Sequence, residues 1–436
     1  MNTAIASFTS KAIQPPDKPT NVAGEAIDSQ VSLIWKAPTN NGGLPITSYT
    51  VSTSPDSSTA TTTSTSTLFT GMSNGTSYTF NVVANNALRN SSSSISPSLT
   101  PYSWTNSAVV TVVAGGTTSG TTAGTGTNAK FNGPRGLTLA SDGNIYLGCG
   151  TSFPIFKITI PEAVVTFVTK STSTGNSDGT GTNASVSNPR GFCSDNSGNV
   201  YFADWGNHLI RKLVVSTNQV ITLTGSGATS GTGADGVGTN GKTWRPFGIC
   251  IDKLNNILYI AGNNGTKILK LDLNTSTLTT IAGQYTAGNT NGVGTSAQFT
   301  SIVGLAVDNL GNLYCCDNTT SVIRKIVLST MTVTTFIGQL NVAGSTNGTG
   351  TNATLTNSTG ITFAPDGNLY VCDGNNLIRK ITLDGVVTTH AGKTTAGTGD
   401  GTGTNASFNG PFGICFDTSG NMYITEAGTH RVRKIT

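Results

Sequence analysis

Charged residues are scarce in this sequence. Asp, Glu, Lys and Arg together make up only 10% of it, where about a quarter is usual. The formal net charge is +4, and no stretch gathers the basic residues. Nucleic-acid binding depends on clustered lysine and arginine, so the sequence predicts no nucleic-acid partner.

Long apolar runs are missing as well. No segment approaches the roughly 18 apolar residues that span a bilayer, which predicts a protein without membrane insertion. The first twenty residues, MNTAIASFTSKAIQPPDKPT, lack a basic stretch followed by an apolar run, so we expect no signal peptide. The corresponding expectation is synthesis in the cytosol, with later association with a cell surface or a virion.

Glycine is abundant, with 54 residues, and threonine, serine and asparagine occur throughout. Hydrophobic residues still make up 36% of the chain, mostly in short Val, Ile and Tyr runs that can bury enough apolar surface to fold. This turn-rich composition predicts an all-β protein. The length of 436 residues is too great for one ordinary core and predicts two domains.

The N-terminal part contains short apolar segments separated by turn residues, such as VSLIW at 31–35 and GMSNGTSYTFNVVANN at 71–86. These segments resemble a fibronectin type III domain. The resemblance implies that Trp35 lies in the core between two sheets. It also implies that Tyr78 forms the tyrosine corner of this fold.

From residue 108 onward the sequence repeats a unit of four short strands. Each unit has an anchor residue, a Gly-x-small stretch, a strand ending at a tyrosine, a strand ending in Lys and an apolar residue, and a Thr/Val strand. Such repetition is typical of β-propellers. The expected anchors are Phe131, Val186, Trp244, Phe299, Leu355 and Phe408, and the tyrosines are Tyr146, Tyr201, Tyr259, Tyr314, Tyr370 and Tyr423.

The last unit stops after its third strand, at Thr436. An additional Thr/Val strand, AVVTVVAGG at 108–116, precedes the first unit and matches the fourth strand of the others. We predict that this strand completes the last blade as a latch, which gives six blades.

The segments FADWGNHLIRKL at 202–213, VCDGNNLIRKI at 371–381 and ITEAGTHRVRKI at 424–435 resemble NHL repeats. The predicted fold is therefore a fibronectin type III-like β-sandwich followed by a six-bladed NHL-type β-propeller closed by an N-terminal latch strand. The expected boundaries are an N-terminal tail at 1–14, the type III domain at 15–105 and the propeller at 106–436.

Four of the six units have an acid three residues after the tyrosine, and the same four have an arginine in the next strand. The first and third units have neither, with Cys149 and Phe156, or Gly262 and Leu269, in their place. This joint occurrence predicts a structural ion pair in each hairpin, worth up to about 1 kcal/mol, rather than a ring of metal ligands. The predicted pairs are Asp204 with Arg211, Asp317 with Arg324, Asp373 with Arg379, and Glu426 with Arg433.

A lysine follows the arginine position in every unit. Two interpretations are open: a ring of lysines that binds an anion, or a solvated lysine at the rim of each blade that keeps sheet edges from pairing with other chains. The second is the simpler. The lysines are Lys157, Lys212, Lys270, Lys325, Lys380 and Lys434.

Histidine is rare, with three residues. His208 and His430 occupy equivalent hairpin positions, while His390 lies in a fourth strand, so the three do not make the metal site that some propeller enzymes have. The loops that repeat as DGTGTNAS lack the alternating acids of a calcium site and are explained as tight turns. We expect no catalytic residue, no metal and no cofactor.

The cysteines follow the repeats too. Cys193, Cys250 and Cys415 share one position, Cys316 and Cys372 share another, and no unit has a cysteine at both positions. This pattern, with an odd total of seven, predicts small buried residues with free thiols, which suits a reducing compartment.

These observations predict a non-catalytic interaction or adhesion scaffold that binds a protein or glycan partner through one propeller face. The expected contact patch is an exposed Trp205 with Asn207 and His208. Low charge and Thr/Ser/Asn richness suit a surface or virion structural protein that assembles into a larger array. The alternative is a metal-dependent hydrolase or lyase at the central channel, which requires metal-binding side chains from at least three units.

Overall fold

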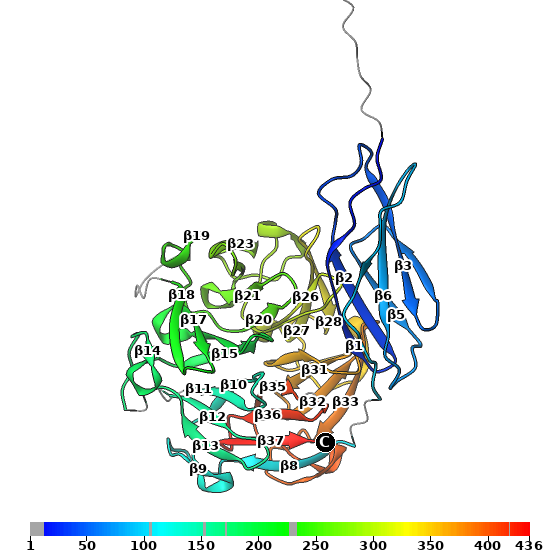
Figure 1. The fold of residues 1–436 in the computed structure, drawn as a ribbon. Coiled ribbons are helices and arrows are strands. Elements are labelled where there is room, and N and C mark those ends of the chain that lie inside the picture. The colour runs from blue at the N-terminus through cyan, green and yellow to red at the C-terminus, as the bar shows by residue number, and fades with distance from the viewer. Residues whose placement is uncertain (1–12, 104–106, 151–153, 171, 226–232, 418) are drawn as a thin grey trace, which may run out of the picture. The chain divides into compact units, whose positions relative to one another are not determined.

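The computed structural model describes residues 13–103, 107–150, 154–170, 172–225, 233–417 and 419–436 (Figure 1). The chain divides into two compact units, Met1–Trp104 and Thr105–Thr436. Most of the N-terminal tail expected at 1–14 lies outside the described residues. Within them, no helix is long and apolar enough to cross a membrane.

The first unit is a sandwich of two sheets. One sheet has the order β1-β2-β5 and the other the order β4-β3-β6-β7. Trp35 of the first sheet is 3% exposed and packs edge-on against Tyr49 of the second, with ring centroids 5.3 Å apart. The strands are β1 (Thr20–Ile27), β2 (Gln30–Lys36), β3 (Ile46–Ser54), β4 (Thr59–Thr62), β5 (Ser66–Thr70), β6 (Thr79–Asn86) and β7 (Ser94–Ile95).

Tyr78 holds the turn that precedes β6. Its ring is fully buried, and its hydroxyl accepts a hydrogen bond of 3.2 Å from the Ser73 backbone N–H. This bond to the backbone a few residues upstream is the tyrosine corner that the sequence predicts.

The described residues of the second unit form six five-stranded sheets. Their first strands are β10 (Pro134–Leu139), β15 (Pro189–Ser194), β20 (Ile249–Asp252), β25 (Ile302–Val307), β30 (Ile361–Phe363) and β35 (Pro411–Phe416). Their second strands are β11 (Ile145–Cys149), β16 (Asn199–Asp204), β21 (Ile257–Gly262), β26 (Asn312–Asp317), β31 (Leu369–Asp373) and β36 (Met422–Glu426). Their third strands are β12 (Ile155–Ile158), β17 (Leu209–Val214), β22 (Lys267–Asp272), β27 (Val322–Val327), β32 (Leu377–Ile381) and β37 (Arg431–Ile435).

The fourth strands close the four-stranded pattern that the sequence predicts. They are β13 (Val164–Phe167), β18 (Gln219–Thr224), β23 (Thr277–Gly283), β28 (Thr332–Ile337), β33 (Val386–Gly392) and, in the last sheet, β8 (Val109–Ala114). β8 comes from the beginning of the unit and pairs antiparallel with β37, with Val110 opposite Ile435.

Each sheet also has a fifth strand that the sequence interpretation missed. It consists of two residues at the start of the repeated Gly-rich loop and pairs with the fourth strand. A three-residue 3-10 turn follows, and its first residue is a glycine with φ between 54° and 58°, a conformation that favours glycine. The strands are β9 (Gly124–Thr125), β14 (Gly179–Thr180), β19 (Gly236–Val237), β24 (Gly292–Val293), β29 (Gly348–Thr349) and β34 (Gly401–Thr402), and the turns are η1 (Gly126–Asn128), η2 (Gly181–Asn183), η4 (Gly238–Asn240), η6 (Gly294–Ser296), η8 (Gly350–Asn352) and η9 (Gly403–Asn405).

The turn between the first and second strands explains the repeated tyrosine. In the second sheet, Asp195 accepts hydrogen bonds from the backbone of Ser197 and Asn199, and from the Tyr201 hydroxyl at 3.0 Å. Although burial opposes ionisation, these bonds lower the pKa of Asp195. The same aspartate–tyrosine bond recurs in four other sheets, at Asp142, Asp308, Asp366 and Asp417.

The first strands surround a common centre (Figure 1). Each contacts the first strand of the next sheet, and β35 contacts β10, so the contacts close into a ring. One glycine per first strand makes this approach possible, because a Cβ there would collide with a backbone carbonyl of the next sheet. The glycines and the carbonyls they face are Gly136 and Arg190, Gly191 and Phe247, Gly248 and Val303, Gly304 and Thr359, Gly360 and Phe412, and Gly413 and Arg135.

Candidate functional site

The four predicted ion pairs are present between the second and third strands. The distances are 2.9 Å for Asp204–Arg211, 3.7 Å for Asp317–Arg324, 3.0 Å for Asp373–Arg379 and 3.2 Å for Glu426–Arg433. In the β16–β17 pair Arg211 lies opposite Phe202 and Asp204 opposite Leu209, so acid and arginine lie diagonally on one face of the hairpin rather than directly opposite.

The environment of these pairs differs from the expectation. All eight side chains are fully buried, so the value of about 1 kcal/mol expected for exposed pairs does not apply. Burial raises the pKa of Asp204 and of Asp373 to about 6, while the neighbouring arginines and hydrogen-bond donors oppose that rise. Removing one partner would leave an uncompensated charge inside the sheet.

Each arginine has further partners in the Gly-rich loop. Arg211 donates to the Ser177 carbonyl at 3.0 Å and forms a second ion pair with Asp178 at 2.8 Å. The loop partners in the other three units are Asn291, Asn347 and Asp400. The arginines therefore fasten the loop between sheets to the hairpin. The sequence carries only a weak sign of this role, because an acid or amide stands before the Gly-rich motif in these units.

The two units without an arginine fill the same space differently. In the first sheet, Phe156 packs edge-on against Phe131, with ring centroids 5.1 Å apart. In the third sheet, Leu269 is 3% exposed, and Asp235 of its loop accepts hydrogen bonds of 2.8 Å from Thr280 instead. Apolar packing thus replaces the ion pair in these two sheets.

One expected anchor residue is wrong by one position. Phe131, Val186, Phe299, Leu355 and Phe408 are fully buried and stand five residues before the ring glycines. In the third unit that position belongs to Thr243, which is 3% exposed, while Trp244 is only partly buried. Trp244 lies instead beside Arg245.

The predicted contact patch begins at the 3-10 turn η3 (Trp205–Asn207), which connects β16 to β17. Trp205, Asn207 and His208 are partly buried, so the expectation of an exposed patch is wrong. The Asn207 amide donates to the Gly175 carbonyl and to Asp204, at 2.6 and 2.8 Å. Two further hairpin turns between second and third strands contain η5 (Asn263–Gly265) and η7 (Asn318–Thr320).

His208 also makes an internal contact, because its Nδ1 accepts a hydrogen bond of 3.1 Å from the Arg245 backbone N–H. His430 does the same for Gly133, at 3.0 Å. Both histidines have φ of 60° and join one sheet to the next. Burial, with Arg245 nearby, lowers the pKa of His208. Asn207 and His208 thus use polar groups inside the protein, whereas Trp205 belongs to a larger arrangement.

Trp205 is part of a stack of arginines and aromatic rings, which we call the arginine–aromatic stack. The Arg190 guanidinium carbon lies 4.0 Å from the Trp205 ring centroid and 4.4 Å from that of Phe247. Arg190 therefore packs against two aromatic rings.

The arginine–aromatic stack continues in both directions. On one side, Arg245 lies 4.9 Å from the Trp205 ring and 5.3 Å from the Trp244 ring. On the other side, Phe247 stacks on Phe412 at 6.1 Å, and Arg135 lies 4.7 Å from the Phe412 ring. Residues of the first, second, third and sixth units thus meet.

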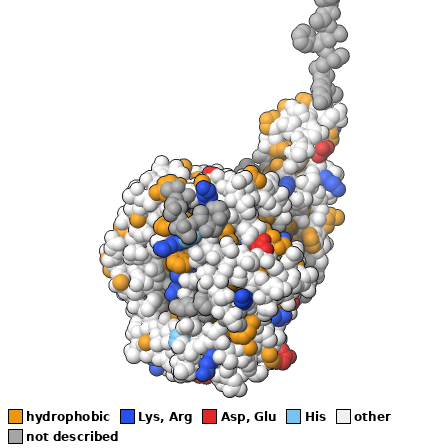
Figure 2. Space-filling view, turned by 90° about the vertical axis from the view of Figure 1, so that its left-hand side faces the viewer, with side chains coloured by type: hydrophobic (Ala, Val, Ile, Leu, Met, Phe, Trp, Pro, Cys, Tyr) orange, Lys and Arg blue, Asp and Glu red, His pale blue; other side chains and the backbone are white. Residues whose placement is uncertain are grey.

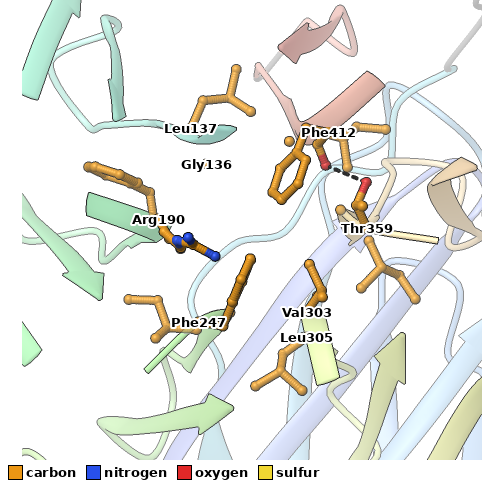
Figure 3. Close-up of a pocket in the computed structure, with 17 residues that line it drawn as sticks. Gly136, Leu137, Arg190, Phe247, Val303, Leu305, Thr359 and Phe412 are labelled. Carbon is orange, nitrogen blue, oxygen red and sulfur yellow. Dashed lines mark hydrogen bonds between the residues drawn. The ribbon is translucent and has the colours of Figure 1, made fainter. Parts of the chain in front are cut away.

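The stack adjoins a small pocket at the centre of the ring. The pocket is lined by residues at or just before the first strands of all six sheets, and Arg190 points into it beside Phe247 (Figure 3). Its cavity volume is about 60 Å³. Pockets for whole small molecules usually measure about 300–1,000 Å³, so only the end of a ligand fits here.

The pocket has a positive potential. Burial, together with the neighbouring Arg135 and Arg245, lowers the pKa of Arg190 to about 9. Burial also lowers the pKa of Arg135. Sequence reasoning missed this site, because it found no cluster of basic residues along the chain. The available signal was the Pro-Arg-Gly triplet at 134–136 and again at 189–191.

Other candidate groups have structural partners. Lys157 and Lys380 form ion pairs with Asp142 and Asp366 of their own sheets, at 2.9 and 2.7 Å, which fits the simpler interpretation of the lysine column at these two positions.

All seven cysteines are free, and Cys193 alone is not fully buried. Among the described residues, no group of three or more His, Cys, Asp or Glu side chains could hold a metal ion.

Comparison with known proteins identifies both parts of the chain. The fibronectin type III domain family matches residues 17–98. The chain is 28% identical over 279 residues to Protein SUPPRESSOR OF QUENCHING 1, chloroplastic, from Arabidopsis thaliana, a match that covers 60% of this chain and 26% of the relative. It is 29% identical over 297 residues to NHL repeat-containing protein 2 from Homo sapiens, covering 59% of this chain and 40% of the relative. The matches therefore span less than half of these relatives.

Solved structures show the same fold over nearly the whole chain. A Bacteroides thetaiotaomicron protein of unknown function has a TM-score of 0.60 at 19% identity, covering 98% of this chain and 100% of that one. An auxiliary nutrient binding protein from the same organism has a TM-score of 0.58 at 17% identity, covering 98% of both chains. The predicted resemblances are confirmed: residues 17–98 match the fibronectin type III domain family, and the chain is similar in sequence to NHL repeat-containing protein 2.

Proposed function

We propose that this chain is a non-catalytic interaction scaffold that binds a protein or glycan partner through one face of its propeller. The contact face is the side where hairpins connect the second and third strands. The observation that supports this choice is the arginine–aromatic stack, which lies on this side and has partly exposed Trp205 and Trp244. Tryptophan and arginine are the residues most enriched where binding energy concentrates in interfaces.

A rigid frame supports this function. We infer six blades, because each of the six ring glycines faces a backbone carbonyl of the next unit, the last facing the first, and because six sheets surround the centre. We infer that β8 is the latch, since it supplies the fourth strand of the sheet that contains β37. A closed ring leaves few sheet edges free and holds the contact face in one geometry.

The proposal includes a structural role at a cell surface or in a virion, within a larger array of copies. Side chains without charge cover most of the face drawn in Figure 2, in keeping with a chain that is 10% charged. Such a surface suits contacts with neutral glycans or with other copies.

The test is a binding screen of the full-length protein on a glycan array and on a protein array. We expect a saturable ligand whose binding falls at least tenfold with Trp244→Ala. Lys253→Ala is the matched control, because Lys253 is exposed in the turn between β20 and β21, at the opposite end of the same sheet. A ligand that is lost equally with both variants, or no saturable ligand at all, would refute the proposal.

The competing hydrolase or lyase function is tested by metal analysis of the purified protein and thermal melts with and without a chelator. The scaffold proposal expects no stoichiometric metal and an unchanged melting temperature. Bound metal and a melting temperature several degrees lower in chelator would favour the enzyme instead.

A further inference from the structure

Seven arginines of the propeller differ in their partners. Arg211, Arg324, Arg379 and Arg433 each form an ion pair with an acid. Within the described part of the chain, Arg135, Arg190 and Arg245 form no ion pair with any carboxylate. The Nε atoms of Arg135 and Arg190 are buried and have no hydrogen-bond partner there, but the same is true of the four ion-paired arginines. What sets Arg135 and Arg190 apart is a partly buried guanidinium charge without an acidic partner, which is costly and points to an anion that completes it.

We propose that Arg190, with Arg135 and Arg245 beside it, binds one oxyanion group, a carboxylate or a phosphate, at the central pocket of the propeller. The inference rests on the proposed scaffold function in one respect: the anion would be a terminal group of the partner that the scaffold binds. The site itself is defined by this chain, so free anions can test it separately.

The geometry of Arg190 favours an oxyanion. The Trp205 and Phe247 ring centroids lie 4.0 and 4.4 Å from its guanidinium carbon, and no carboxylate of the described residues pairs with its in-plane N–H edge. This edge forms two parallel hydrogen bonds with a carboxylate or a phosphate. The aromatic rings also restrict the side chain, so less conformational freedom is lost on binding.

The pocket determines how much of the ligand enters. Its cavity volume of about 60 Å³ suits a terminal group, with the rest of the ligand outside. Apolar side chains such as Leu137 and Leu305 line it together with Phe247 and Phe412 (Figure 3). Surroundings of low polarity strengthen the attraction between an anion and the Arg190 guanidinium group.

The experiment titrates full-length protein with sodium acetate and, separately, with inorganic phosphate at constant ionic strength. Arginine Nε–Hε signals in nuclear magnetic resonance spectra report the binding, together with the melting temperature. We expect saturable shifts of the Arg190 signal and a rise in melting temperature. Arg190→Gln is expected to weaken binding at least tenfold. Arg89→Gln, which removes an exposed arginine of the first unit, is the charge-matched control and is expected to bind as the unmodified protein does.

The two titrations distinguish the chemistry of the ligand. Saturation by acetate alone indicates a carboxylate, saturation by phosphate alone indicates a phosphate, and saturation by both indicates the oxyanion chemistry that they share. If Arg190→Gln does not fold, Arg245→Gln replaces it, because Arg245 is exposed, and a weakening of about threefold is expected. No saturable shift with either anion, or equal binding by the Arg190→Gln and Arg89→Gln variants, would overturn the proposal. Loss of the partner with Trp244→Ala in that case would leave the scaffold function standing.

Discussion

Individual arginines have two different roles in this propeller. Those of the third strands each connect a hairpin acid to the Gly-rich loop that precedes their sheet, so that one side chain joins two segments. Arg211 does so through Asp204 and Asp178. Those near the axis stack on aromatic rings and have no acidic partner among the described residues. The first role is structural, and the second is available to a ligand.

The structural role is tested by Arg211→Leu. This change leaves the buried Asp204 carboxyl without its cation, and we expect a loss of roughly 3–5 kcal/mol in the free energy of unfolding. Denaturant unfolding followed by circular dichroism measures it. The double variant Asp204→Gly with Arg211→Leu recreates the pair found in the third sheet, Gly262 and Leu269, and is expected to lose less than the single variant. An equal or greater loss in the double variant would contradict this explanation.

A second prediction concerns pH. Burial, with Lys380 nearby, lowers the pKa of His390 to about 4, whereas an unperturbed histidine has a pKa of about 6.5. Between these values the unfolded chain binds more protons than the folded one, so the free energy of unfolding falls as the pH falls. The slope is at most about 1.4 kcal/mol per pH unit.

His390→Phe is the test of this effect. His390 packs edge-on against Tyr370 at 5.1 Å, and Phe336 packs in the same way against Tyr314 in the preceding sheet, so phenylalanine preserves the contact. Unfolding measured from pH 7 to pH 4.5 should show a smaller loss of stability in the variant. Parallel pH profiles for variant and unmodified protein would show that His390 does not contribute.

At the scale of strands and turns, the repeated sequence made much of the fold predictable. The tyrosines, the hairpin acids and the arginines recur at fixed spacing, and each recurring column has one role in the structure. Features that occur in a single unit were harder to predict from the sequence. Thr243 occupies the buried anchor position, and Trp244, the next residue, is only partly buried. An aromatic residue next to that position misled the sequence interpretation.

The arginine–aromatic stack could not be predicted for a related reason. Arg135, Arg190 and Arg245 come from three units, and an arginine stands before the ring glycine in only two of the six. They meet because the ring closes, which no local pattern encodes. The contacts between the third-strand arginines and the side chains of the Gly-rich loops likewise join segments that are far apart in the sequence, so no local pattern predicts them.

The ring glycines give a prediction at this scale. A methyl group at Gly304 would collide with the Thr359 carbonyl, which belongs to the backbone of the next sheet and cannot move aside easily. We expect Gly304→Ala to lower the free energy of unfolding by about 1–3 kcal/mol. Gly116→Ala is the control, because the nearest atom there, the Thr127 carbonyl oxygen, lies at an ordinary 3.5 Å. Its effect should stay within about 0.5 kcal/mol in the same denaturant experiment.

At the scale of the whole molecule, strand β8 supplies the fourth strand of the last sheet. This strand carries the chain from the first unit into the last sheet of the second, so the proposed latch is also the connection between the two units. Val110 is fully buried in that sheet, whereas Val109, its neighbour in the strand, is 37% exposed.

The proposed latch is tested with this pair of valines. Val110→Asp places a carboxylate between β34 and β37, and we expect it to reduce the free energy of unfolding of the propeller by more than about 3 kcal/mol. Val109→Asp, in the same strand but on its more exposed side, should have a much smaller effect. Thermal melts followed by circular dichroism compare the two, and equal melting temperatures would argue against the latch.

The pairing of β8 with β37 also determines how the propeller would respond to mechanical tension. Val109 exchanges two backbone hydrogen bonds with Thr436, of 3.2 and 3.1 Å, so the start of one strand lies beside the end of the other. Tension between the chain before β8 and the chain after β37 pulls both strands from this same end. Their hydrogen bonds then break one after another rather than together, as in a zipper. Under such a load the seam would open at low force, before the five sheets that are each built from consecutive strands.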